Sequence, residues 1–190
     1  MVKLNKIYTR TGDQGDTGLA DGSRIPKDHA RARAIGDVDE LNCLIGVALG
    51  AVADADVQTM LSAIQNELFD LGADLATPGE DFAPSDMTLR IVQQQIDRLE
   101  REIDRMNEGL EPLRSFILPA GAHGTAELHL ARAVARRAER SAVGASREIA
   151  LNPLALIYLN RLSDWLFVAA RHVAAKQGGD VLWQPGATRG

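Results

Sequence analysis

The sequence predicts an all-α protein, a five-helix bundle with an irregular, glycine-rich N-terminal loop. Apolar residues recur at intervals of three and four in five separate segments, which is the spacing of one face of a helix. Aromatic residues make up only 4% of the chain, while alanine and leucine are abundant. This composition favours helices packed on helices. Glycine and proline are concentrated in the stretches over 77–86 and 111–124, and Asn152 with Pro153 separates the last two segments.

A chain of 190 residues can bury a sizeable core as one domain. We expect a single domain over 1–190, in which 1–29 form a nucleotide-binding loop, 30–177 the helical bundle and 178–190 a C-terminal tail. The five expected helices span 30–53, 57–75, 88–107, 125–150 and 153–176.

Residues at the expected helix starts are typical N-caps. We expect Asp56 to cap the second helix, and Ser85 or Asp86 to cap the third. Asn152 is expected to cap the fifth helix, with Pro153 in its first turn. The third helix carries one face dense in charge, which we interpret as a solvent-exposed face with i,i+4 ion pairs and no chemistry.

The formal net charge of −5 argues against a general nucleic-acid-binding protein, which would need a basic surface. The only cysteine, Cys43, cannot form an intrachain disulfide, and its apolar neighbours predict a small core residue. We expect no signal peptide in residues 1–6, and the apolar stretches are too short to span a membrane. These features together predict a cytoplasmic protein.

The most informative segment is the expected helix around 128–141. Its small apolar residues form one stripe, which would let a neighbouring helix approach closely, and its charged residues form a second stripe beside the first. The apolar stripe contains Ala131, Val134, Ala135, Ala138 and Ala142, the charged stripe contains Arg132, Arg136, Glu139 and Arg140, and Arg137 stands apart. Guanidinium groups match phosphate oxygens, so a polyphosphate site is one interpretation. The alternative is a solvated face of Arg–Glu pairs.

The segment over 7–29 combines four glycines with hydroxyl and cationic side chains, a composition that suits a phosphate cradle. It lacks the Gly-Lys-Ser/Thr of a P-loop and the Glu of an EF-hand, and a plain surface turn cluster is the alternative. A second loop over 111–124 carries the apolar residues Phe116, Ile117 and Leu118, which must pack on the bundle, a partner or a ligand. The chain has no Glu-x-x-His pair and no two-His zinc helix, and metal ligands are not identified.

Five short motifs, considered together, carry a resemblance. They lie in this order at residues 7–13, 38–42, 116–119, 136–140 and 159–164. With these motifs the chain resembles the PduO-type ATP:cob(I)alamin adenosyltransferases over nearly its whole length. The resemblance implies a five-helix bundle assembled as a homotrimer, with active sites between subunits.

The resemblance also implies roles for individual residues. Phe116 would close the lower face of the corrin, and Asp39 and Arg132 would pair between subunits beside it, so that these three form the cobalamin-binding set. Together with Arg136 they are the expected catalytic residues. The ATP-binding residues would be Thr9, Arg10, Thr11, Gly12, Thr17, Gly18, Lys27, Arg136, Arg137, Glu139, Arg140 and Asn160. One departure is Ala120, where many members carry glycine.

The implied reaction joins the 5′-deoxyadenosyl group of ATP to the cobalt of cob(I)alamin and gives adenosylcobalamin and triphosphate. The implied ligands are ATP with Mg²⁺ and cobalamin as a substrate, and further implied partners are a flavin reductase and a B12-dependent acceptor enzyme. Two alternatives belong to other classes. One is a helical-bundle sensor that binds ATP or polyphosphate without chemistry, and the other is a purely structural trimer.

Overall fold

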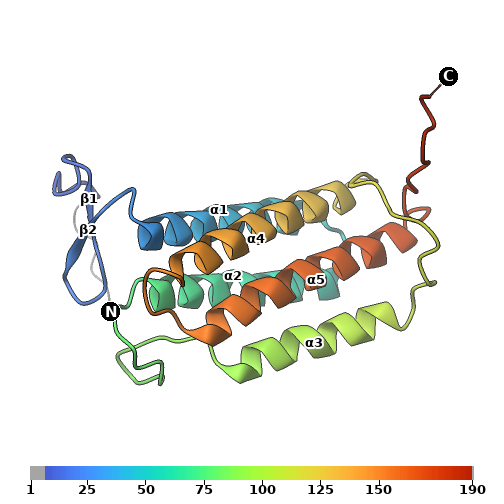
Figure 1. Ribbon diagram of the computed structural model, residues 1–190. Helices are drawn as coiled ribbons and strands as arrows, with labels where there is room; N and C mark the ends of the chain where they lie inside the picture. The colour runs from blue at the N-terminus through green and yellow to red at the C-terminus, as the bar shows by residue number, and fades with distance from the viewer. Residues whose placement is uncertain (1–6, 190) are drawn as a thin grey trace.

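The computed structural model describes residues 7–189, and five α-helices form most of it (Figure 1). The helices are α1 (Ala30–Ala51), α2 (Ala55–Leu75), α3 (Gln93–Asn107), α4 (Thr125–Ala145) and α5 (Pro153–Ala175). The expected five-helix bundle is therefore confirmed. Residues 1–6, where we expect no signal peptide, lie outside the described residues. Between residues 7 and 189, no helix is long and apolar enough to cross a membrane.

Helix α4 packs between α1 and α5, α1 also packs against α2, and α3 packs on the other side of α5 (Figure 1). The expected apolar stripe of α4 faces this interior. Ala131, Ala135, Ala138 and Ala142 are completely buried, and Val134 is almost so. Because the distance between packed helices depends on the side chains at their contact, this alanine stripe lets α4 lie close to both neighbours.

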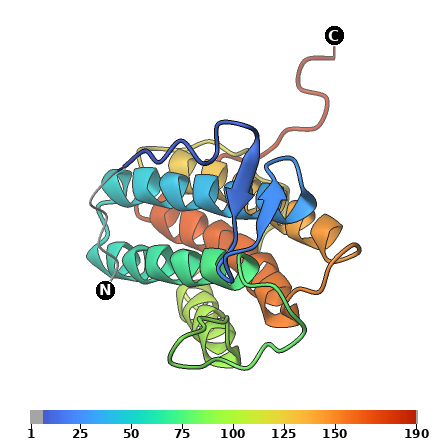
Figure 2. The ribbon, with the colours of Figure 1, turned by 90° about the vertical axis from the view of Figure 1, so that its left-hand side faces the viewer.

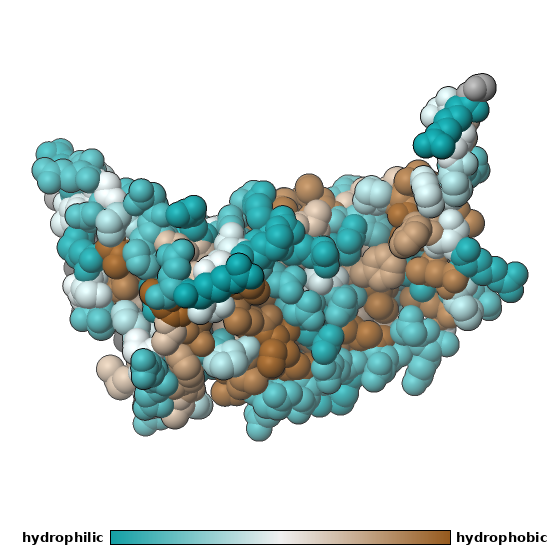
Figure 3. All heavy atoms as spheres, in the orientation of Figure 1, coloured by the Kyte–Doolittle hydropathy of each residue, from teal (hydrophilic) through white to brown (hydrophobic). Residues whose placement is uncertain are grey.

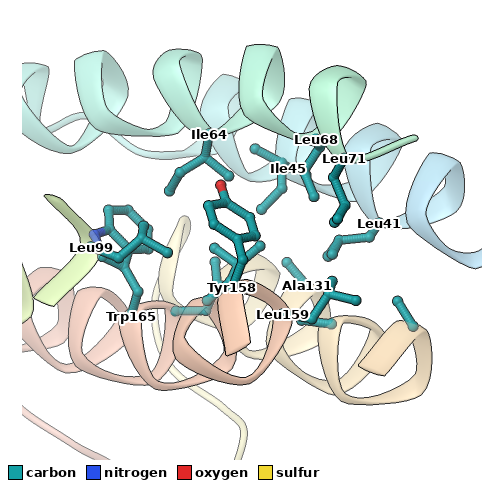
Figure 4. Packing of buried hydrophobic residues seen from close by; sticks show 14 of the residues in the cluster. Leu41, Ile45, Ile64, Leu68, Leu71, Leu99, Ala131, Tyr158, Leu159 and Trp165 are labelled. Carbon is teal, nitrogen blue, oxygen red and sulfur yellow. The ribbon is translucent and has the colours of Figure 1, made fainter. Parts of the chain in front are cut away.

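The core contains two large aromatic side chains of α5, Tyr158 and Trp165, and both are fully buried (Figure 4). Their polar atoms are satisfied by acidic residues on other helices. The Tyr158 hydroxyl donates to Glu67 Oε2 on α2 (2.7 Å), and Trp165 Nε1 donates to Glu102 Oε2 on α3 (2.8 Å). Burial, and then the charge of Glu67, raises the pKa of Tyr158 well above its ordinary value.

The charged face of α3 is only partly a solvent face. Arg98 forms the expected i,i+4 pair with Glu102 (2.6 Å), but it also binds Glu67 on α2 (2.5 Å), so it joins the two acidic residues that satisfy the aromatic pair. This corrects the expectation of an entirely solvated face. The cause is the packing of α3 on α5, which brings this part of α3 toward α2.

A buried carboxylate, Asp74, joins three segments near one end of the bundle. Its side chain is only about 1% exposed, and it accepts hydrogen bonds from Arg90 Nη1 (2.8 Å), the Ile91 backbone N–H (2.8 Å) and Asn152 Nδ2 (2.7 Å). These contacts bind residues 90 and 91 outside any helix, so α3 begins at Gln93 instead of 88. The expected caps at Ser85 and Asp86 are therefore wrong.

Other helix boundaries also differ from the expected ones. Asp54 caps α2, because its Oδ1 accepts from the backbone N–H groups of Asp56 and Val57, and Asp56 itself lies in the first turn. Helix α4 ends at Ala145, and turns with hydrogen bonds to Gly144 and Ala145 replace its expected last residues. The cap at Asn152 is confirmed, since its Oδ1 accepts from the Leu154 N–H (3.0 Å).

Cys43 is exposed, which corrects its expected place in the core. Helix α1 buries Leu41, Asn42 and Ile45 against its neighbours. A residue that follows Asn42 by about 100° turns away from this buried face. The apolar neighbours of Cys43 in the sequence predicted a buried thiol, and this prediction is wrong.

The N-terminal loop contains a short hairpin that the sequence analysis did not predict. Strands β1 (Asp16–Gly18) and β2 (Arg24–Pro26) pair antiparallel, with Thr17 opposite Ile25. Figure 2 shows the hairpin in front of the helices, and Figure 1 places it at the opposite end of the bundle from the C-terminal tail. The hairpin and the tail are thus available to form parts of different surfaces.

We predict that Asp74→Asn lowers the free energy of unfolding by about 3–5 kcal/mol, because the buried Arg90 guanidinium loses its anion. Urea denaturation followed by circular dichroism measures this loss. A matched control is Asp164→Asn, which removes a half-exposed carboxylate paired with Arg161 (3.0 Å) and should cost less than about 1 kcal/mol. Equal losses in the two variants would contradict the structural role of Asp74.

Candidate functional site

A cationic groove lies between α4 and α5. Arg136, Glu139 and Arg140 line it from α4, and Asn160 lines it from α5; its volume is about 460 Å³. Asn160 Nδ2 donates to Glu139 Oε1 (2.9 Å), so the two helices are tied together inside the groove. Four residues of the expected ATP-binding set are thus brought together. The groove offers guanidinium groups for phosphate oxygens and an oriented carboxylate between them.

Arg137 does not line this groove. It extends toward α1, where it forms an ion pair with Glu40 and lies near Asp37, with 3.6 Å between Arg137 Nε and Asp37 Oδ1. The hydrogen bond to Glu40 raises the pKa of Arg137 above its ordinary value. Arg137 therefore stands apart from the other arginines of α4, as the helical spacing predicts.

A second, mainly apolar cavity of about 680 Å³ adjoins α4 one turn before the groove. It is lined by residues of the 111–124 loop, α4, α5 and the C-terminal tail, including Phe116, His129, Arg132, Phe167 and Trp183. Figure 3 shows apolar surface at the end of the molecule from which the tail projects. Such a cavity suits a large apolar or aromatic ring system.

Phe116 is the most exposed aromatic residue of this cavity, at 77%. The C-terminal tail contacts Phe116 through Trp183. The Phe116 and Trp183 rings meet edge to face with centroids 6.0 Å apart, and the Trp183 backbone N–H donates to the Phe116 carbonyl (2.9 Å). A second bond runs from Ser115 Oγ to the Trp183 carbonyl (3.1 Å). The Phe116 ring is thus exposed to solvent while its backbone is held by hydrogen bonds, and this arrangement suits contact with a flat ligand.

Arg132 and His129 form the polar part of the cavity. The Arg132 guanidinium lies 5.9 Å from the centre of the Phe167 ring, and burial, followed by the charge of Arg136, lowers the pKa of Arg132. His129 is 2% exposed, and its Nδ1 has no hydrogen-bond partner among the described residues. Burial, and then the charge of Arg132, lowers the pKa of His129, which favours the neutral form of its ring.

The N-terminal loop carries the other expected binding residues and lies on a separate surface. Thr17, Gly18 and Lys27 line a cavity of about 630 Å³ with Asp39 of α1, and α2 completes its wall. Within one chain, this cavity shares no lining residue with the groove or with the Phe116 cavity. The structure therefore divides the expected site residues into two sets on different helix pairs.

Two cationic side chains of the N-terminal loop, Arg24 and Lys27, form hydrogen bonds with carbonyl groups of the loop backbone. Lys27 Nζ donates to the Gly12 carbonyl (2.9 Å), and Arg24 Nη2 donates to the Thr11 carbonyl (2.7 Å). A side chain at Gly12 would bring a Cβ within 3.2 Å of the Asp16 carbonyl oxygen, so any other residue would force this backbone to shift. Thr9 and Thr11 share a hydroxyl hydrogen bond (2.8 Å), and Arg10 adopts a positive φ of 63°. This compact turn presents Thr, Arg and Lys donors together, as a phosphate cradle would.

Three residues of this apolar cavity are not among those expected from the sequence: His129, Phe167 and Trp183. His129 had a detectable signal, since it precedes Arg132 by three residues and Arg136 by seven, and so lies on the same face of α4. Phe167 and Trp183 had none, because their position depends on how α5 and the tail pack against the loop. In residues 7–189, no group of three or more His, Cys, Asp or Glu side chains is placed to hold a metal ion.

Comparison with known proteins gives a consistent picture. Residues 7–173 match the cobalamin adenosyltransferase family. The corrinoid adenosyltransferase of Mycobacterium tuberculosis is 50% identical over 99% of this chain and 97% of its own length. The cobalamin adenosyltransferase of Cupriavidus metallidurans is 46% identical over 96% of each chain.

A solved structure agrees with these matches. It is a variant of the PduO-type ATP:corrinoid adenosyltransferase from Lactobacillus reuteri, complexed with cobalamin and ATP. The two folds superpose with a TM-score of 0.86 at 38% identity, over 94% of this chain and 99% of the other. This chain therefore belongs to the cobalamin adenosyltransferase family.

Proposed function

We propose that this protein transfers the 5′-deoxyadenosyl group of ATP to the cobalt of cob(I)alamin and releases triphosphate. One observation carries the proposal. The apolar cavity with Phe116 and the cationic groove with Arg136 adjoin along α4, and Arg132 of the cavity precedes Arg136 by a single turn. A large ring system and a polyphosphate could therefore bind side by side, with the reacting atoms near the boundary.

The reaction needs little acid–base chemistry from the protein. The electron pair of cobalt(I) forms the new bond to C5′ of ATP, the C5′–O bond breaks, and the triphosphate leaves with the electron pair of that C5′–O bond. Since cob(I)alamin is itself the nucleophile, the protein contributes position and electrostatics. Holding C5′ and cobalt in line within one cleft removes much of the entropic cost of their encounter.

The groove would stabilise the departing triphosphate. Arg136 and Arg140 are its cations, and Glu139, fixed by Asn160, keeps a carboxylate between them. We propose that Mg²⁺ arrives on the phosphate oxygens of ATP, where it would neutralise part of their charge. Arg137 would join by exchanging Glu40 for phosphate, and this costs little because an ion pair exposed to solvent contributes little to stability.

We propose that the loop residues complete the site from a neighbouring subunit of a homotrimer. The support is geometric, because the cavity of Lys27 and Asp39 belongs to α1 and α2, while the groove belongs to α4 and α5. Asp39 would then pair with Arg132 across the interface, beside the corrin. The loop residues of this set are Thr9, Arg10, Thr11, Gly12, Thr17, Gly18 and Lys27.

Phe116 would cover the lower face of the corrin and keep water and the axial base from cobalt. Its exposed ring and braced backbone suit this role. Without an axial donor, cobalt(II) is easier to reduce to cobalt(I), because the orbital that accepts the electron is lower in energy. The chain would act as one catalytic domain over 1–190, supplied by a reductase and delivering its product to a B12-dependent enzyme.

A spectroscopic assay tests the proposed function. The protein is mixed with MgATP and chemically reduced cob(I)alamin in the dark, and the absorbance spectrum is followed. We expect an alkylcobalamin spectrum that light bleaches, together with one triphosphate per cobalamin. ATP binding without this conversion would instead favour the sensor that binds ATP without chemistry.

We predict that Phe116→Ala reduces turnover at least tenfold when the assay starts from cob(II)alamin and a reductant, because water or the base then coordinates cobalt. The loss should be much smaller with pre-reduced cob(I)alamin. Met87→Ala is the control, since Met87 is also an exposed large apolar side chain but lines neither the Phe116 cavity, the cationic groove nor the cavity of Lys27 and Asp39. Equal losses of Phe116→Ala in the two assays would contradict the role in reduction.

Mixed oligomers test the division of the site between subunits. Lys27→Ala and Arg136→Ala should each be nearly inactive alone, because each removes a cation for the triphosphate. If the site is shared, co-assembly in equal amounts should restore about a quarter of wild-type activity, since one interface in four pairs two intact halves. Activity no higher than that of the separate variants would show that each chain uses only its own residues.

A further inference from the structure

The cationic groove contains a third arginine that the sequence analysis did not assign. Arg147 lines it with Arg136 and Arg140, while Glu139 is the only acidic residue of the lining. Among residues 7–189, no ion pair or hydrogen bond is found for the three guanidinium groups of these arginines, whereas Arg137 and Arg161 nearby are both paired. Three unpaired like charges around one hollow favour an anion that would lie among them.

The order of the arginines along α4 gives the groove a direction. Arg132 borders the apolar cavity, Arg136 and Arg140 follow at intervals of one turn, and Arg147 comes just beyond the helix end at Ala145. Under the proposed function, C5′ must lie at the cavity, where cobalt reaches it. The phosphates then extend away from the cavity in the order α, β, γ, and the terminal phosphate lies nearest to Arg147.

The early end of α4 creates this position. The carbonyl end of a helix carries a partial negative charge and would repel a phosphate. Here the chain leaves the helix in a turn, in which the Arg147 N–H donates to the Gly144 carbonyl (3.3 Å). This turn places Arg147 in the lining of the groove. Gly144 lines the same groove, and a Cβ added there would meet no atom within 4 Å, so the space between Arg140 and Arg147 is open.

We propose that Arg147 binds the terminal phosphate of ATP and makes the site select a nucleoside triphosphate over a diphosphate. The inference rests on the proposed function, since that function fixes which end of ATP lies at the cavity. ATP carries about one more negative charge than ADP, on the group that Arg147 would contact. A guanidinium placed there adds affinity for ATP and none for ADP.

The test compares Arg147→Gln with Arg101→Gln. Arg101 is also an exposed arginine, it lies on α3 without an ion pair to any residue of 7–189, and it lines none of these cavities. Isothermal titration calorimetry measures the Kd of ATP, ADP and inorganic tripolyphosphate at constant Mg²⁺ without cobalamin. We expect Arg147→Gln to weaken ATP and tripolyphosphate about tenfold and ADP less than twofold, as for one lost charge-assisted hydrogen bond. Arg101→Gln should leave all three Kd values unchanged.

Two results would overturn the inference alone. The first result is a wild-type protein that binds ATP more tightly than ADP and an Arg147→Gln variant with the same ratio of the two Kd values. This result would show that Arg147 does not contact the terminal phosphate. An equal loss for ATP and ADP would place Arg147 on a phosphate common to both, or would indicate a folding defect, which circular dichroism of the variant identifies. Wild-type protein that binds neither ATP nor tripolyphosphate would overturn the proposed function as well.

Discussion

Close packing of α4 against α1 and α5 is the constraint on which the rest of the structure depends. Its buried alanines keep the helices close together, so the arginines that follow Arg132 on α4 must emerge at the edge of a contact. Arg136 and Arg140 emerge beside α5 and line a groove, whereas Arg137 emerges beside α1 and pairs with Glu40. One stripe of small residues thus determines which arginines are paired and which are left for a ligand.

Local patterns predicted the helices well, because a repeat of three and four apolar residues acts within a few turns. The same patterns failed where contacts between residues far apart in the sequence determine a helix boundary or a cavity wall. The start of α3 depends on Asp74, which binds Arg90 and Ile91 from another helix. The wall of the apolar cavity depends on Trp183 meeting Phe116 after the chain has crossed the whole of α4 and α5. Neither contact leaves a local signal in the sequence.

The candidate site shows the same division. Helical spacing predicted that Arg132, Arg136, Glu139 and Arg140 lie together, and the structure brings three of them into one groove with Asn160. The loop residues with Thr17 and Lys27 were associated with them only by resemblance to a family, and within one chain they line another cavity. A site shared between subunits would explain why neither surface alone contains all the donors that a triphosphate and a corrin require.

The pairing of the tail with the Phe116 loop has a consequence for the order in which the protein matures. All five helices precede residue 176, but the strap that braces Phe116 is made by residues 181–183. During synthesis the N-terminal parts of a chain fold first. The helical bundle can therefore form before residues 181–183 close the wall of the cavity, and the ring that faces the ligand is fixed in place only after the helices have packed.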